Sequence, residues 1–269
     1  MKKISRKQKR VMNEMKIDCE KVANEIVDFL QSYFAKSKKK KAIIGLSGGI
    51  DSAIVAALCE KALGRENVIV VKLPYKSSWC QESIRDADLV VENLDLLSEN
   101  VHLEYINEVV DAIAKGETDK IIRGNIMARV RMIFLYKYPK NEGLVIGTSN
   151  KSELLLGYFT RWGDGAADLE PIGDLYKTQV FQLARYLNIP ERIIEKIPTA
   201  DLWQGQTDEG EIGCPYSLLD TLLFLTFDKG ICKKELLTYG YKEKDIDAII
   251  GRVKVNEFKR NPIPACKLN

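Results

Sequence analysis

The chain has 269 residues, of which 45% are hydrophobic and 29% are charged, and its formal net charge is +3 at pH 7. This composition is typical of a globular protein with a sizeable core, and the charge is too small to indicate nucleic-acid binding. No apolar run approaches the roughly 20 residues that span a bilayer, and no apolar stretch follows the basic N-terminus as it would in a signal peptide. We therefore expect a cytoplasmic protein that binds neither membranes nor nucleic acids.

We find no sign of a binding or metal site among the clustered basic residues, the cysteines or the single histidine. Lysines and arginines cluster at residues 2–10 and 38–41, which we interpret as a frayed terminus and a solvated loop rather than a polyanion site. None of the six cysteines forms a C-x-x-C pair, so zinc and iron–sulfur clusters have no support. His102 lies in an apolar-alternating stretch (VHLEYI), which predicts a strand and a structural role.

The first 150 residues predict strands that alternate with helices. A first amphipathic helix is marked by apolar residues at helical spacing, namely Val22, Ile26, Phe29, Leu30 and Tyr33. Short apolar runs predict strands at 42–46, 67–73, 101–106 and 144–148, and helical spacing predicts helices at 53–63, 82–96 and 118–138. This alternation implies an α/β fold with a doubly wound parallel sheet and helices on both faces.

Beyond residue 150 the strand signal fades. Residues 162–165 form a predicted loop, and helices are expected at 177–188, 191–197, 217–227 and 243–258. Residues 207–213 (TDEGEIG) are acidic and contain glycine, so we expect a mobile lid, and the prolines at 262 and 264 exclude a helical tail. No repeat, linker or domain boundary is visible, which predicts a single domain over residues 1–269.

The strongest motif is Ser-Gly-Gly-Ile-Asp-Ser at residues 47–52, between a predicted strand and a predicted helix. Glycines let the backbone approach a ligand closely, and the free N–H groups at a helix start favour an anion. Asp51 would itself repel a phosphate, so its carboxylate indicates bound Mg²⁺. A plain capped turn needs only one Ser or Asp, and we favour the phosphate site over that alternative.

This loop belongs to neither of the two commonest phosphate motifs. It lacks the lysine of the Walker sequence and the G-x-G-x-x-G of the dinucleotide fingerprint. A second segment, GTSNKSE at 147–153, follows the fourth predicted strand. Ligands of parallel sheets bind at the carboxyl ends of strands, so both segments should face one crevice, where Glu153 could complete a Mg²⁺ site with Asp51.

Several charged residues have ordinary alternatives when they are taken by themselves. Arg129 and Arg131 have the spacing of a wet helix face, which we favour from spacing alone. Asp164 and Asp168 suit turns. Lys177 suits a solvated first helical turn, although a cation there is mildly unfavourable and hints at a nearby anion.

The loop at residues 47–52 resembles the pyrophosphate loop of the ATP pyrophosphatase family, whose members cleave ATP between its α- and β-phosphates. Further motifs in a nearly unbroken order over residues 42–264 are similar to those of the NAD synthetase family. They are GNIMARVRM at 124–132, GTSNKSE at 147–153, GYFTRWGDGAAD at 157–168, PIGDLYK at 171–177, PTADL at 198–202 and FKR at 258–260.

The resemblance implies an adenine nucleotide alpha hydrolase-like fold. It implies an ATP site at Gly45, Leu46, Ser47, Gly48, Gly49, Ile50, Asp51, Ser52, Thr148, Lys177 and Thr199. It implies Mg²⁺ on Asp51 and Glu153, with Asp51 and Lys177 as catalytic residues. It implies a deamido-NAD site at Arg129 or Arg131, Arg161, Asp168, Phe258 and Lys259. Two positions depart from the commonest family pattern, because Arg161 replaces a lysine and Phe258 replaces a histidine.

The implied reaction is the ATP-dependent amidation of deamido-NAD to NAD through an adenylated intermediate, with AMP and pyrophosphate as products. Use of glutamine would require a second active site with an activated nucleophile, for which 269 residues leave no room beside a synthetase. We therefore expect ammonia as the nitrogen donor. The family resemblance also implies a homodimer.

Three other functions have less support. A tRNA-modifying enzyme with the same loop would normally bring a strongly basic surface, and often paired cysteines. A non-catalytic nucleotide-binding module would leave Asp51 and Glu153 without a purpose. A GMP synthetase would need a different C-terminal region.

Overall fold

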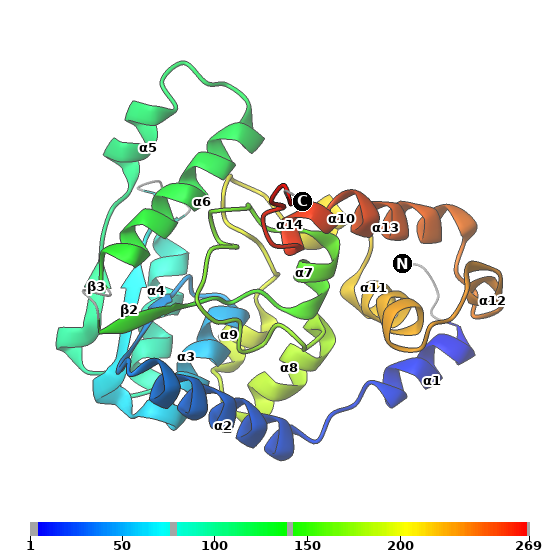
Figure 1. The fold of residues 1–269 in the computed structure, drawn as a ribbon, viewed down its shortest axis with the longest axis horizontal. Helices are drawn as coiled ribbons and strands as arrows, with labels where there is room; N and C mark the ends of the chain where they lie inside the picture. Colours follow the sequence, from blue (N-terminus) through cyan, green and yellow to red (C-terminus); the bar gives the residue numbers. More distant parts are fainter. Residues whose placement is uncertain (1–4, 76–79, 139–141, 268–269) are drawn as a thin grey trace.

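The computed structural model describes residues 5–75, 80–138 and 142–267, without the side chain of residue 80. Its centre is a parallel sheet with the strand order β3-β2-β1-β4 (Figure 1). The strands are β1 (Lys41–Gly45), β2 (Val68–Lys72), β3 (Val101–Leu103) and β4 (Gly143–Ile146). In the register Ile43 of β1 lies opposite Ile69 of β2 and Val145 of β4. The predicted parallel sheet is confirmed.

Strand β3 is shorter than the 101–106 run that the apolar alternation predicts. Glu104 still donates its N–H to the Lys72 carbonyl at 2.9 Å, but the next residue of the neighbouring segment that should donate is Pro74. Proline has no N–H, so one bond of the ladder is missing and regular pairing stops, although the Ile106 N–H still donates to the Pro74 carbonyl at 3.3 Å. His102 lies in β3 with its ring centroid 4.7 Å from that of Tyr138, which agrees with a structural role.

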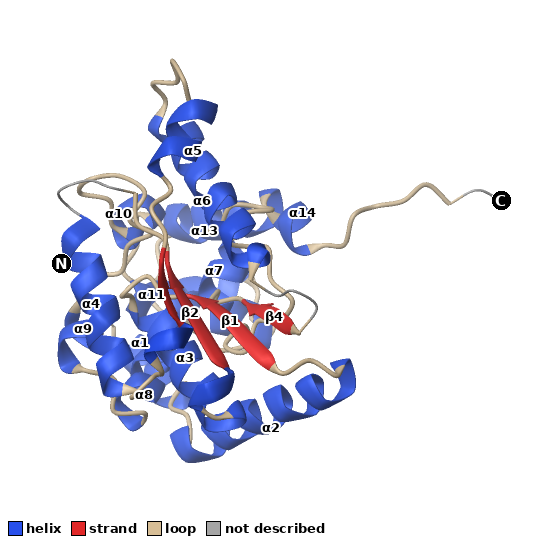
Figure 2. Ribbon diagram, turned by 90° about the vertical axis from the view of Figure 1, so that its left-hand side faces the viewer, coloured by secondary structure: helices blue, strands red, loops and turns tan. Residues whose placement is uncertain are grey.

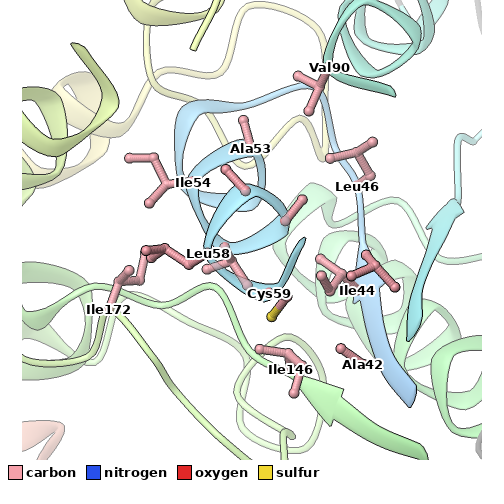
Figure 3. Packing of buried hydrophobic residues seen from close by; sticks show 14 of the residues in the cluster. Ala42, Ile44, Leu46, Ala53, Ile54, Leu58, Cys59, Val90, Ile146 and Ile172 are labelled. Atoms are coloured by element: carbon pink, nitrogen blue, oxygen red, sulfur yellow. The ribbon is translucent and has the colours of Figure 1, made fainter. Parts of the chain in front are cut away.

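One face of the sheet is covered by α2 (Cys19–Ser37), α3 (Ile50–Leu63) and α8 (Lys177–Tyr186). Figure 2 shows these three helices on one side of the strands. Helix α3 is buried along most of its length, and Figure 3 shows its Cys59 pointing toward Ile146 and its Leu58 next to Ile172. Burial on this scale, at about 25 cal/mol per Å² of apolar surface, fixes the helix that follows the loop at residues 47–52.

The other face is covered by α5 (Asn107–Ile113) and α6 (Lys120–Lys137), which bury Ile43, Val71 and Val145 (Figure 2). Helices α4 (Cys80–Asn93) and α9 (Glu191–Glu195) lie beside α3, and two short 3₁₀ turns span Arg65–Asn67 and Ser98–Asn100. Helices on both faces confirm the doubly wound architecture. Among the described residues, no helix is long and apolar enough to cross a membrane.

A helical cluster with its own buried core lies beside the sheet (Figure 1). It contacts the sheet layer through α8. Its elements are α1 (Arg6–Glu14), α7 (Lys151–Leu156), α11 (Tyr216–Leu223) with a π-helical turn (Phe224–Asp228), α12 (Lys233–Thr238), α13 (Glu243–Val255) and α14 (Glu257–Arg260). Residues 262–267 are not helical, as the prolines at 262 and 264 predict.

The interpretation of residues 2–10 as a frayed terminus is wrong for the part that the structure describes. Residues 1–4 lie outside the described residues, but Ser5 and Gln8 form a reciprocal capping box at the start of α1. Val11 and Met15 then enter the helical core at 2% and 3% exposure. The charges conceal an amphipathic helix, because its apolar residues are few but correctly spaced.

Residues 207–213, which we expect to be a mobile lid, are helical in the structure, and their mobility stays a prediction. They form helix α10 (Asp208–Ile212), in which Thr207 accepts a hydrogen bond from the Gly210 N–H and Gly213 closes the helix with a φ of 77°. Helices α5, α7 and α12 were likewise not predicted, since each has seven residues or fewer. Short helices offer too few turns for a periodic apolar signal.

Candidate active site

A cavity of about 540 Å³ lies at the carboxyl ends of β1, β2 and β4. The loop after β1 and the segment after β4 both line it, as expected for two segments that share one crevice. Of the ATP-site residues that the family resemblance implies, the cavity is lined by Gly45, Leu46, Ser47, Gly49, Ile50, Asp51, Ser52, Thr148, Lys177 and Thr199.

Hydrogen bonds between its own residues hold the loop at 47–52 in shape. The Ser47 N–H donates to Ser52 Oγ at 3.2 Å, and the Gly49 N–H donates to Ser47 Oγ at 3.2 Å. Ser52 Oγ donates to the Gly49 carbonyl at 3.0 Å. The two serines therefore preorganise the turn. Helix α3 begins at Ile50, within this motif, so its first N–H groups, which have no partner inside the helix, belong to the motif itself.

Gly48 does not line the cavity, although the family resemblance puts it in the ATP site. Its φ is +73°, and a Cβ added there would lie 2.5 Å from the Ser83 carbonyl and 2.9 Å from Asp86 Cβ. Only glycine tolerates both that conformation and that approach of α4. Gly48 therefore serves the site by letting α4 pack against the back of the loop.

Asp51, Glu153 and Lys177 meet in one cluster inside the cavity. The Lys177 Nζ lies 2.5 Å from Asp51 Oδ2 and 3.3 Å from Glu153 Oε1. Lys177 is 2% exposed, so its interpretation as a solvated first-turn lysine is wrong. Helix α8 begins at this residue, and its backbone N–H donates to Ser152 Oγ at 3.0 Å.

Asn150 links the two carboxylates and was not assigned a role from the sequence. Its Nδ2 donates to Asp51 Oδ1 at 3.0 Å, and its backbone N–H donates to Glu153 Oε2 at 3.2 Å. Asn150 and Glu153 form a capping box at the start of α7. The N-x-x-E spacing, a recognised capping signal, was available in the sequence.

Burial and charge act in opposite directions on this cluster. Burial favours the neutral amine of Lys177, but Asp51 and Glu153 outweigh it and raise the Lys177 pKa above its usual range. Burial raises the pKa of Glu153 to about 8, although Lys177 acts in the opposite direction. The cluster therefore holds one cation that stays protonated between two carboxylates, one of which gives up its proton reluctantly.

Asp208 brings a third carboxylate near Lys177 from α10. Its Oδ2 accepts a hydrogen bond from the Tyr216 hydroxyl at 3.0 Å, and burial raises its pKa. The Tyr158 hydroxyl donates to Glu211 Oε2 at 2.5 Å and so ties α10 to the end of α7. The contact between Tyr158 and Glu211 could not be predicted from the sequence, because the two residues lie 53 positions apart.

Two further acids near the end of β4 were not assigned to the site from the sequence. Asp164 Oδ1 accepts a hydrogen bond from the Thr160 N–H at 2.9 Å and lines the cavity, and the protein packed around its carboxyl raises its pKa. Glu170 Oε2 accepts from the Ser149 N–H at 3.0 Å, and burial raises the Glu170 pKa to about 8. The sequence around each of these acids is typical of a turn, so neither was assigned to the site.

Only two of the residues implied for deamido-NAD line the cavity, Arg131 and Lys259. Arg131 Nε donates to the Leu73 carbonyl at the end of β2 at 3.2 Å. Lys259 Nζ donates to the carbonyls of Gly157 and Phe159 at 2.7 and 2.9 Å. Burial lowers the pKa of Lys259, since its partners are carbonyls rather than carboxylates.

The other four implied residues lie outside the cavity lining. Arg129 donates to the Arg161 carbonyl at 3.3 Å, and the Arg161 guanidinium lies 5.6 Å from the Phe258 ring centroid. These three residues therefore form one group. Asp168 is exposed, and its carboxylate accepts a hydrogen bond from the Val145 N–H at 2.8 Å. That contact gives Asp168 a structural role at the edge of β4.

A parallel sheet with this loop after β1 and paired carboxylates beside it defines an α/β protein of the pyrophosphate-loop class. The model of the NAD synthase family matches residues 22–263, so the chain belongs to that family. The chain is 45% identical over 252 residues to an NH(3)-dependent NAD(+) synthetase of Fusobacterium nucleatum subsp. nucleatum, covering 93% of this chain and 96% of the relative.

Two solved structures are similar over nearly the whole chain. An NH3-dependent NAD synthetase from Campylobacter jejuni, in complex with the nitrate ion, is 34% identical with a TM-score of 0.79, covering 93% of this chain and 100% of that one. An NMN synthetase from Francisella tularensis is 31% identical with a TM-score of 0.80, covering 94% and 100%. The two relatives differ in the product that their names state.

Proposed function

We propose that this protein converts deamido-NAD to NAD, with ATP and ammonia as co-substrates. The observation that carries the proposal is the cluster of Asp51, Glu153 and Lys177 directly beside the loop at 47–52 in one cavity. The names of relatives that match over almost their full length support the same reaction.

The chemistry explains why such a site is needed. A carboxylate is a poor acceptor for an amine, so one of its oxygens first attacks the α-phosphorus of ATP and pyrophosphate departs with the electron pair of the broken P–O bond. Ammonia then attacks the acyl carbon of the adenylate, loses a proton, and AMP leaves. Neither step needs a protein nucleophile, so positioning and electrostatic stabilisation carry the rate.

In this proposal ATP lies along the loop, with its phosphates at residues 47–52 and Lys177. The ammonium of Lys177 stays charged because Asp51 and Glu153 hold it. It is therefore a fixed positive charge beside the departing pyrophosphate. Thr148 and Thr199 line the same cavity and complete the nucleotide site.

Mg²⁺ fits the donor set of this cluster. Among residues 5–75, 80–138 and 142–267, no group of three or more Asp, Glu, His or Cys side chains is arranged around one metal position. Mg²⁺ usually takes only one or two protein carboxylates and fills its other positions with water and substrate phosphates. Asp51 and Glu153 would hold it, and it would neutralise phosphate charge there.

The metal assignment is tested by Asp51→Asn and Glu153→Gln. Both variants should fold and lose most of their Mg²⁺-dependent turnover, because each removes one anionic oxygen ligand. Asp174→Asn is the control, since Asp174 is an exposed carboxylate that also pairs with a lysine, Lys151. Normal rates with unchanged Mg²⁺ dependence in both test variants would show that the metal is held elsewhere.

Deamido-NAD, in the same proposal, reaches from Arg131 and Lys259 toward the group of Arg129, Arg161 and Phe258. That group is partly exposed, with Phe258 at 55%. A homodimer in which the partner subunit covers this surface would complete the binding site. Sedimentation equilibrium tests the dimer, and a monomer at working enzyme concentrations contradicts it. The cytoplasmic location and the closing of α10 over the substrates stay predictions.

The decisive experiment supplies purified protein with ATP, Mg²⁺ and deamido-NAD, with either ammonium chloride or ammonia-free glutamine. NAD, AMP and pyrophosphate should form in equal amounts with ammonium, and the rate should rise with pH as more ammonia is unprotonated. Nicotinate mononucleotide, offered in a parallel reaction, should be the poorer substrate. Preference for the mononucleotide, or NAD formation from glutamine with matching glutamate release, would overturn the proposal.

A further inference from the structure

A buried carboxylate lies behind the loop at 47–52 and pairs with two cations. Asp86 of α4 is 1% exposed. Its Oδ1 lies 2.6 Å from Arg192 Nε, and its Oδ2 lies 2.7 Å from Lys196 Nζ. Burying an unpaired carboxylate raises the free energy of the folded protein. The two ion pairs therefore stabilise Asp86, and Asp86 in turn fixes the positions of both cations.

The two cations face different surroundings. The Arg192 side chain is 55% exposed, does not line the cavity, and also contacts the exposed Glu82 at 3.1 Å. The Lys196 side chain is only 22% exposed and lines the cavity. Arg192 is therefore paired with a second carboxylate at the protein surface, whereas Lys196 lines the cavity.

Lys196 lies directly against the loop. Its Nζ is 3.5 Å from the Gly48 carbonyl and 3.3 Å from Ser83 Oγ. Gly48 and α4 are in such close contact that no Cβ fits between them. Because Asp86 also belongs to α4, one packed contact fixes the position of the loop, the carboxylate and the ammonium together.

We propose that Lys196 binds the β- and γ-phosphates of ATP and the departing pyrophosphate, and that Asp86 is the residue that positions it. The inference deepens the proposed function and rests on it. When the bond between the α-phosphorus and the bridging oxygen breaks, the electron pair stays on that oxygen and the charge on pyrophosphate grows. The Lys196 side chain stabilises that charge by electrostatic contact with the phosphate oxygens.

Lys177 does not make this cation redundant. Its ammonium is held between Asp51 and Glu153, and it therefore occupies a different place beside the loop. Lys196 contacts the loop on the side of α4 and shares its carboxylate with a second cation. Pyrophosphate held by the loop would therefore have a cation on both sides.

The test is Lys196→Met beside the matched control Arg192→Met, which removes the other partner of Asp86. Calorimetric titration with inorganic pyrophosphate and Mg²⁺ measures binding without catalysis. Lys196→Met should bind pyrophosphate about tenfold to a hundredfold more weakly, as for loss of a charged hydrogen bond. It should also raise the KM for ATP, with the KM for deamido-NAD unmoved.

Arg192→Met should keep wild-type pyrophosphate affinity, and Lys196→Arg should restore most of the loss. Thermal unfolding confirms that each variant is folded. Wild-type pyrophosphate affinity in folded Lys196→Met, or an equal loss in both methionine variants, would show that the pair with Asp86 is only structural. Failure of the wild-type protein to make NAD contradicts the proposed function instead, and the two failures are thus distinguishable.

Discussion

Lys177 and Lys259 both line the cavity, but the protein holds their amines in opposite ways. The Lys177 ammonium lies between the carboxylates of Asp51 and Glu153, and its pKa is raised. The Lys259 ammonium donates to two backbone carbonyls, and its pKa is lowered by burial. Hydrogen bonds to neutral groups fix the position of a buried amine. A nearby opposite charge is needed to offset the loss of hydration of its charged form.

The different partners of the two lysines suit them to different roles in the site. A lysine paired with carboxylates is a permanent charge and part of the architecture of the site. A lysine held by carbonyls keeps an uncompensated charge, so an anionic ligand would strengthen its protonated form. Lys177 therefore suits a fixed role beside the phosphates, and Lys259 suits a contact that is completed only when substrate arrives.

The largest effect is expected for Lys177→Met. The rate of NAD formation should fall by about a hundredfold to a thousandfold, as for loss of a transition-state charge contact. Two carboxylates would also face each other without a cation, which costs about 3 kcal/mol of stability when a buried pair is broken. Initial rates and urea unfolding measure the two effects.

The control is Lys151→Met, because Lys151 also pairs with two carboxylates, those of Asp174 and Asp228, but does not line the cavity. It should keep its activity and lose at most about 1 kcal/mol of stability, as for an exposed ion pair. Equal activity losses in the two variants would mean that ion pairing in this region, and not the position in the cavity, determines the rate.

A second prediction concerns Lys259→Met and its control Arg260→Met. Both side chains donate to backbone carbonyls in or just after α7, and only Lys259 lines the cavity. Each variant should lose about 1 to 2 kcal/mol of stability. Only Lys259→Met should raise the KM for deamido-NAD, by about tenfold. If the KM rises equally in both variants, Lys259 acts only by supporting α7.

A third, smaller effect distinguishes the two amines chemically. An acylating reagent attacks the neutral amine, so Lys259 should react faster than Lys177 at pH 8 in the free protein. Peptide-level mass spectrometry measures the two rates in one sample. Deamido-NAD should protect Lys259 and leave Lys177 unchanged. Faster labelling of Lys177 would contradict the electrostatic comparison directly.

The sequence allowed us to predict the part of this site that follows from strand ends. The parallel sheet places the ends of β1 and β4 next to each other, so Asp51 and Glu153 had to approach one another. Lys177 needed more than that, because its spacing fits an exposed helix start equally well. The loop before Lys177 places this residue in the core, and that loop has no periodic pattern from which its path could be predicted.

Other parts of the site left a signal in the sequence that we did not use, or left no local signal at all. The N-x-x-E pattern at Asn150 was a helix cap, and Thr207 with Gly213 marked both ends of α10. The pairing of Asp86 with Lys196 joins residues 110 positions apart. Such a contact depends on how α4 packs against the loop, and no local pattern in the sequence records it.

The last prediction concerns the stability of the protein and not its activity, and it comes from Asp220, the acidic counterpart of Lys259. This buried carboxylate accepts hydrogen bonds from the Ser152 hydroxyl at 2.6 Å and the Thr178 N–H at 2.7 Å, and both donors are neutral. Burial raises its pKa from 3.8 to about 6. The folded protein therefore binds this proton more tightly than the unfolded chain does between about pH 4 and pH 6.

Stability must then fall as the pH rises through that window, because the folded state loses the proton that it favours. At about 1.4 kcal/mol per pKa unit, wild type should lose up to about 3 kcal/mol relative to Asp220→Asn, which cannot titrate. Urea unfolding at several pH values between 4 and 7 measures the difference in slope. Asp28→Asn, at an exposed carboxylate on α2, should follow wild type. Parallel curves for wild type and Asp220→Asn would contradict this prediction. They would mean that two neutral donors stabilise the Asp220 carboxylate as well as a cation would. The electrostatic contrast between Lys177 and Lys259 would then have no basis.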